Sequence, residues 1–82
     1  MKLNPIGANK TELHLSNGTI VLFSYKTPVA AFAPDTAGGW LRTEKRYSNT
    51  TSKHITQWLD SQGVPSGRVT IVPQEHIDAL AR

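Results

Sequence analysis

The chain contains no cysteine, and this absence excludes several kinds of site at once. Disulfide bonds, thiolate nucleophiles and cysteine-based zinc or iron–sulfur centres all need a residue that the 82 positions do not include. Long apolar runs are missing too, since the longest stretch without a formal charge, Leu13–Tyr25, is too short to cross a bilayer. We therefore expect no membrane partner.

Signals for secretion and for catalysis are also scarce. Residues Met1–Pro5 have no apolar stretch, which predicts a protein that acts in the cytoplasm. The six acidic residues show no paired arrangement suited to general acid and base chemistry. His14, His54 and His76 fall on separate segments without metal-ligand spacing. We expect no enzyme, no metal and no cofactor.

The length and composition are those of one small domain. With 38% hydrophobic and 18% charged residues, the chain lies near the averages for globular proteins, and its length leaves room for a single core. The prediction is one α+β domain over residues 1–82, in which residues 1–10 form a loosely ordered N-terminal arm.

Alternation predicts a β-hairpin near the start of this domain. Residues 11–16 alternate between polar and apolar, which places Leu13 on the buried face of a half-buried strand and Glu12 on the polar face. Asn17-Gly18 favours a type I′ turn, and the β-branched and aromatic residues 19–25 form the returning strand. Because this second strand is apolar on both alternating sets, we expect it at the centre of the sheet.

A third strand is predicted to complete the meander. Pro28 cannot donate to a strand ladder, so it indicates a bulge or bend after which the second strand continues over residues 29–33. Residues 34–39 have the composition of a turn, and residues 40–47 form a third strand paired back on the second.

The second half of the chain predicts a helix, a strand and another helix. Thr51-Ser52 offers a cap for an amphipathic helix that ends at Gly63 and carries Trp58 as a core anchor. Residues 69–72 form a short buried strand, and Pro73 opens the last helix. The predicted class is α+β, an antiparallel three-stranded meander followed by a helix, a short strand and a C-terminal helix (β-β-β-α-β-α).

The net charge of +3 is concentrated in one segment. Residues 42–53 hold four cations and one anion, Glu44, so the rest of the chain is balanced. Alternate side chains of a strand share a face, so Arg42 and Arg46 project together beside Glu44. Cations and hydroxyl groups near the start of a helix are typical of an anion site. The predicted ligand-binding residues are Arg42, Lys45, Arg46, Tyr47, Thr51, Ser52, Lys53 and His54.

Simpler interpretations of this segment stay open. The cations can serve only to discourage pairing at an exposed sheet edge. Thr51 or Ser52 can be no more than a helix cap, with Lys53 and His54 solvated on the first turn. Trp40 follows two glycines at a strand start, which favours it as the more exposed tryptophan and as a protein-interface residue.

Several blocks carry a resemblance to a known family. Residues 6–12, 22–30 (with SYKTPVA), 47–59 (YSNTTSKHITQWL) and 72–75 resemble an uncharacterised family of small proteins encoded by tailed phages, prophages and some bacteria. The turn at residues 34–39 is longer than is typical of it. The resemblance covers nearly the whole chain and implies a phage or mobile-element origin and action in the cytoplasm of an infected bacterium. It supplies no catalytic or binding residue.

Two functions of different classes follow from these observations. The first is a non-enzymatic module that binds an anionic ligand, nucleic acid or a nucleotide, through the basic segment. The alternative is an inhibitor of a host protein, for instance a defence nuclease, that acts by protein contact with Trp40 as an aromatic anchor. A homodimer through a free strand edge is a third arrangement, because a small chain gains buried apolar area in this way.

Overall fold

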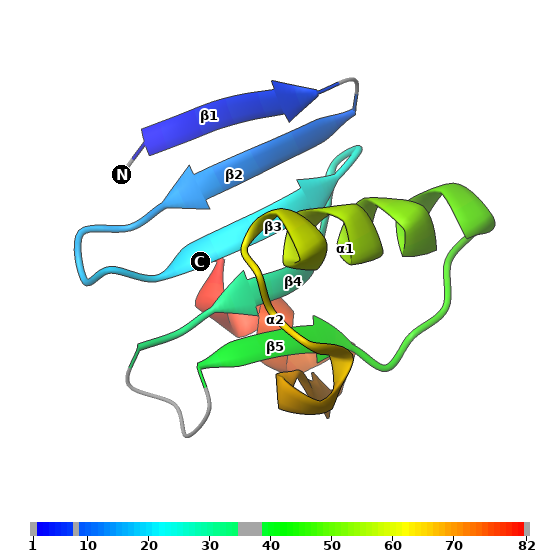
Figure 1. Ribbon diagram of the computed structural model, residues 1–82. Helices are drawn as coiled ribbons and strands as arrows, with labels where there is room; N and C mark the ends of the chain where they lie inside the picture. Colours follow the sequence, from blue (N-terminus) through cyan, green and yellow to red (C-terminus); the bar gives the residue numbers. More distant parts are fainter. Residues whose placement is uncertain (1, 8, 35–38, 82) are drawn as a thin grey trace.

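Strand-forming residues from both halves of the chain build one mixed sheet with a helix on each face. The computed structural model describes residues 2–7, 9–34 and 39–81. The strands are β1 (Lys2–Gly7), β2 (Lys10–His14), β3 (Ile20–Ser24), β4 (Thr27–Phe32), β5 (Trp40–Thr43) and β6 (Thr70–Val72). The helices are α1 (Asn49–Ser61) and α2 (Gln74–Leu80), with a short 3₁₀ turn at Ser66–Arg68. Figure 1 shows α1 in front of the sheet and α2 behind it.

The strands follow one another across the sheet in the order β1-β2-β3-β4-β5-β6. The first four pairings are antiparallel, whereas β5 and β6 pair in parallel. Parallel neighbours need a crossover connection, and α1 supplies it between β5 and β6. The α+β prediction is confirmed at this level, while the number and order of the strands differ from the predicted meander.

Two apolar clusters, one on each face, hold the helices to the sheet. Val21 and Leu22 are neighbours in β3 that point to opposite faces, and neither has any exposed surface. Leu22 packs in the cluster that contains Trp58 of α1, and Val21 packs in the cluster that contains Ile77 of α2. The prediction of a central strand covered on both faces is therefore confirmed.

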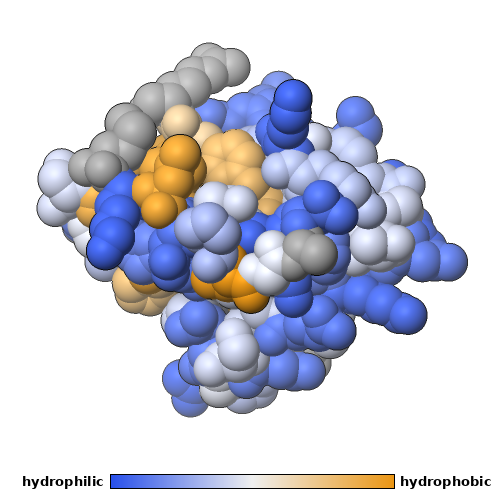
Figure 2. All heavy atoms as spheres, turned by 90° about the horizontal axis from the view of Figure 1, so that it is seen from above, coloured by the Kyte–Doolittle hydropathy of each residue, from blue (hydrophilic) through white to orange (hydrophobic). Residues whose placement is uncertain are grey.

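The N-terminal segment is not the loose arm that composition suggested. Residues Lys2–Gly7 form β1, which pairs with β2 along its length. Every residue of β1 is exposed, because this edge strand is covered on neither face by a buried cluster. Figure 2 looks onto this end from above and shows apolar groups among a mainly hydrophilic surface. Leu3 and Ile6 of β1 are among the exposed large apolar side chains.

The predicted second strand is in fact two strands. β3 and β4 are separate antiparallel neighbours joined by a turn at Tyr25-Lys26, where we expected one strand with a bulge or bend at Pro28. The residue types at Tyr25-Lys26 do not predict a turn. The turn needs a positive φ at Tyr25, 58°, and a bulky residue rarely adopts such a φ. Pro28 lies inside β4 opposite Phe23, beside a register shift, so the irregularity predicted at this proline is present.

The hairpin at Asn17-Gly18 is confirmed, but its turn type was wrong. Gly18 has a positive φ of 91°, whereas Asn17 is not among the residues with positive φ, as a type I′ turn would require. The Leu15 N–H donates to the Thr19 carbonyl at 2.9 Å, which gives a three-residue loop. The Asn17 side chain stabilises it by accepting from the Thr19 N–H at 3.0 Å.

Two further boundaries differ from the predictions. β5 ends at Thr43 and not at residue 47. The predicted turn at residues 34–39 falls mainly on residues 35–38, outside the described part of the chain. Neither described helix is long and apolar enough to span a bilayer.

Candidate anion-binding site

The basic segment connects β5 to α1 instead of continuing the strand. Within β5 the predicted alternation holds, since Leu41 and Thr43 are buried and Arg42 is half-buried on the opposite face. The Glu44 N–H still donates to the Val72 carbonyl at 2.8 Å, and after it the chain turns toward α1. The segment therefore passes from the sheet edge to a helix start within a few residues.

Ser48, and not Thr51 or Ser52, is the N-cap of α1. Its hydroxyl accepts from the Thr51 N–H at 3.1 Å, and its carbonyl accepts from the Ser52 N–H at 3.0 Å. This leaves the first helical residues with the unpaired backbone N–H groups that every helix start has. Arg46 donates from Nη2 to Asn49 Oδ1 at 3.3 Å, which holds its guanidinium beside the helix start.

These elements enclose a surface cavity of about 270 Å³. Six of the eight predicted ligand-binding residues line it: Arg42, Lys45, Arg46, Tyr47, Thr51 and Ser52. Thr43, Glu44, Ile55 and Ile71 complete its walls. We call this hollow the basic cavity, because three of its four charged side chains are cations.

The cations of the basic cavity are not neutralised by a carboxylate within the described residues. An ion pair with Glu44 would weaken this face for a ligand, yet the only ion pair in the part of the chain that the structure describes joins His14 to Glu12. Lys45 instead lies with its Nζ 5.2 Å from the centre of the Tyr47 ring. The three positive groups are therefore available to an external anion.

Tyr47 lines this cavity and carries a phenol. Partial burial, and then the negative charge of Asp78, raise the pKa of its phenol above the ordinary value. The hydroxyl therefore stays protonated at neutral pH. A protonated phenol can donate to a phosphate oxygen, as serine and threonine hydroxyls do.

Lys53 and His54 lie outside the basic cavity. Lys53 is exposed on α1, and neither residue is among the cavity walls. His54 is buried under α1, where its Nδ1 lies 2.7 Å from the Ser24 hydroxyl; that hydroxyl is 3.1 Å from the Thr51 Oγ1. Burial, and then the nearby charge of Lys10, lower the pKa of His54. His54 is thus neutral at pH 7 and is not the solvated residue that one interpretation expected.

The Ser24–His54 contact resembles a nucleophile and its base only in composition. Ser24 is 2% exposed, so its hydroxyl cannot reach a substrate in this fold. A nucleophile also has to lie where reacting atoms can approach it. We therefore assign the pair a structural role, fixing the first turns of α1 to β3. Among the described residues, no three acidic or histidine side chains gather as a metal ion would require.

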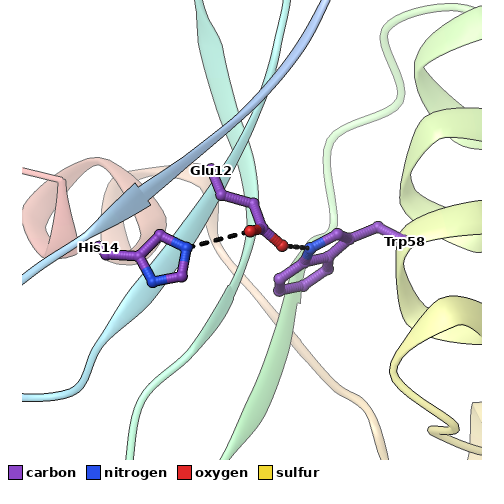
Figure 3. A network of polar contacts seen from close by, with 3 residues as sticks. All are labelled: Glu12, His14 and Trp58. Carbon is purple, nitrogen blue, oxygen red and sulfur yellow. Dashed lines mark hydrogen bonds and ion pairs between the residues drawn. The ribbon is translucent and has the colours of Figure 1, made fainter. Parts of the chain in front are cut away.

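Sequence reasoning missed a buried polar contact on the same face of the sheet. Glu12 was expected to face solvent, but it is 8% exposed and lies under α1. Its Oε2 accepts from the Trp58 Nε1–H at 2.6 Å, and its Oε1 lies 3.0 Å from His14 Nε2 (Figure 3). One signal for it did exist, since a buried indole N–H needs an acceptor. Alternation alone could not say which residue supplies it.

The contacts of Glu12 also set its charge. Burial acts to raise the pKa of this carboxyl, but the hydrogen bond from Trp58 and the hydrogen bond and charge of His14 outweigh burial, with a smaller contribution from Asn4. The net effect lowers the pKa below its ordinary value. Glu12 is therefore charged, both of its carboxylate oxygens have a partner, and it connects β2 to α1.

Trp40 is half-buried and is therefore the more exposed of the two tryptophans, as predicted, since Trp58 is 2% exposed. Its ring packs against Phe32, with centroids 4.7 Å apart, and edge-on against Trp58 at 5.6 Å. Part of Trp40 borders a shallow hollow that Arg68 also lines. It therefore offers a partner only one side of its ring.

Comparison with known proteins places the chain in a family. A model described as "Family of unknown function (DUF8033)" matches residues 1–78. The chain belongs to this family. No curated protein and no solved structure matches it. The DUF8033 description carries no activity and no residue roles, so the chemistry of the site rests on the geometry above.

Proposed function

We propose that this DUF8033 protein is a non-enzymatic binding protein that holds a phosphate-bearing ligand, nucleic acid or a nucleotide, in the basic cavity. One observation carries the proposal. Cations from the end of β5 and from the following connection line a single hollow together with the hydroxyl groups at the start of α1. Within the described residues these cations have no carboxylate partner.

The chemistry of the basic cavity suits an oxyanion such as phosphate and not a metal ion. Arg42 and Arg46 carry planar guanidinium groups that can donate two hydrogen bonds to one phosphate. The Tyr47 hydroxyl, and the free N–H groups at the start of α1, add donors that need no counter-charge. Glu44 reduces the local positive charge, so the affinity should be moderate and depend on salt.

The proposed setting is the bacterial cytoplasm during infection by a phage or transfer of a mobile element. It follows from the sequence blocks described above. In that setting nucleic acids and nucleotides are abundant phosphate ligands.

Fluorescence anisotropy of a labelled single-stranded oligonucleotide titrated with the protein tests the proposal. We expect binding at low salt, with log affinity falling against log salt at a slope of magnitude about 2 to 3, because three cations meet phosphates at roughly 0.7 to 0.9 each. A competition with a mononucleotide separates nucleotide from polymer binding. Absence of binding of both probes at the lowest salt used would remove the proposal.

A protein partner is the second candidate, and an apolar surface that shares no residue with the basic cavity favours it. Leu3 and Tyr25 are exposed and line a hollow of about 290 Å³ with Phe23. Exposed apolar patches of this kind often mark interfaces. Pull-down from bacterial lysate after nuclease treatment tests a host partner, and light scattering tests a second copy of the chain. Loss of either contact on Leu3→Ser would assign it to this patch.

A further inference from the structure

A second cavity adjoins the basic cavity and differs from it in chemistry. It has a volume of about 220 Å³ and lies between α1 and the β6 edge. Aliphatic side chains form most of its walls: Leu59, Val64, Val69 and Ile71. Arg42 and Ile71 line both cavities, so the two hollows share a wall.

Ile71 of β6 is a large apolar residue whose side chain is mostly exposed. It pairs with Arg42 across β5 and β6, yet its side chain is 65% exposed. An apolar side chain between two hollows gains burial when one ligand covers both of them. Each hollow alone is smaller than the roughly 300 to 1,000 Å³ of a typical small-molecule pocket, which also favours one ligand that extends across the pair.

Besides the Arg42 that it shares with the basic cavity, the apolar cavity has two polar side chains, both on α1. Thr56 and Asp60, one turn apart on α1, border it. Among the described residues Asp60 forms no ion pair, so its carboxylate is free to accept hydrogen bonds. A flat, mostly apolar ring fits the aliphatic walls of this cavity, and two adjacent N–H donors on one edge of the ring can both donate to the Asp60 carboxylate. Guanine is the base whose edge offers two neighbouring donors to a carboxylate, N1–H and the N2 amine.

We propose that the paired cavities bind a guanine nucleotide, with the phosphate in the basic cavity and the base in the apolar cavity against Asp60. This inference rests on the proposed function and adds the identity of the base. Adenine and cytosine each place a ring-nitrogen acceptor beside their amine donor. That acceptor would face the Asp60 carboxylate and repel it, so these bases bind more weakly.

Calorimetric titration of the full chain with GMP, AMP and ribose 5-phosphate tests the inference. We expect GMP to bind about tenfold or more tightly than the other two, the discrimination of one good bidentate contact. Asp60→Asn should remove the preference for GMP and leave ribose 5-phosphate binding unchanged. Glu75→Gln, which removes an exposed acid on α2, is the matched control and should keep the preference.

The outcomes separate this inference from the proposed function. Equal affinity for GMP and ribose 5-phosphate would overturn the base site while the phosphate site stands. A preference for AMP would overturn the guanine assignment, as would a GMP preference that survives Asp60→Asn. If none of the three ligands binds while the oligonucleotide does, the nucleotide inference is wrong. If the oligonucleotide also fails, the proposed function falls with it.

Discussion

Glu12 accepts a hydrogen bond from the indole nitrogen of Trp58 at 2.6 Å, and this contact joins β2 to α1 across 46 positions of sequence. Both groups are buried, so neither can exchange its partner for water. Removing either side chain therefore lowers the free energy of unfolding mainly because the other group stays buried without a hydrogen-bond partner.

Glu12→Ala should lower the free energy of unfolding by about 1 to 3 kcal/mol, because the Trp58 N–H loses its acceptor inside the core. Glu12→Gln retains an acceptor oxygen and should cost less. Chemical denaturation measures both. Glu44→Ala removes an exposed acid and serves as the control, with an expected change within about 0.5 kcal/mol. Equal midpoints for the Glu12→Ala and Glu44→Ala variants would contradict the structural role of the contact.

Acid should weaken the fold through Glu12. Its pKa is lower in the folded chain than the ordinary value of 4.5, so the unfolded chain binds the proton more readily. The stabilisation is then complete above pH 4.5 and is lost as pH falls through the folded pKa. In Glu12→Gln this part of the pH dependence should disappear. An unchanged acid limb in that variant would show that other carboxyl groups produce it.

His54 should add a second loss of stability at milder pH. Its pKa is lowered from 6.5 in the folded chain, so between the folded pKa and 6.5 the unfolded chain binds a proton that the folded chain does not. Stability is then complete above pH 6.5 and declines as pH falls below it. Thermal melts of His54→Gln should lack this decline, whereas melts of His76→Gln, at an exposed position, should keep it.

Substitutions in the core and on the surface should differ sharply. Trp58→Ala or Leu59→Ala should destabilise by about 2 to 5 kcal/mol, because both side chains are buried between α1 and the sheet. Leu3→Ala removes an apolar side chain that is 66% exposed and should change stability by about 0.5 kcal/mol or less. A large loss in the Leu3 variant would mean that β1 is covered in solution, for instance by a second copy.

Periodicity was sufficient to predict the core but not the strand connections. The apolar residues of β3 and the helical spacing around Trp58 follow local rules, and both predictions are confirmed. The turn at Tyr25 could not be foreseen, because a tyrosine with positive φ is held by its surroundings. The hydrogen bond from its N–H to the Asn9 carbonyl, at 2.7 Å, is one such contact. The sequence pattern of a residue does not contain contacts of this kind.

Local charge and hydroxyl content predicted most residues of the basic cavity, but two of the predicted helix residues, Lys53 and His54, lie outside it. Arg42, Lys45 and Arg46 come together because a short connection joins β5 to α1. Lys53 and His54 lie only a few residues further, but each step along a helix turns the side chain by about 100°. The position of the cap decides which way they point. Ser48 begins the helix earlier than the expected cap, and His54 consequently faces the sheet.

The most direct test of the central claim compares two single cations by anisotropy with the same labelled oligonucleotide. Arg46→Ala removes a wall of the basic cavity, whereas Lys53→Ala removes an exposed cation of α1 outside it. We predict that Arg46→Ala weakens binding about fivefold or more and lowers the salt slope by about 1, because one phosphate contact is lost. Lys53→Ala should stay within about twofold of the unmodified chain. Equal effects of the two substitutions, or no effect of Arg46→Ala, would contradict a ligand site in the basic cavity.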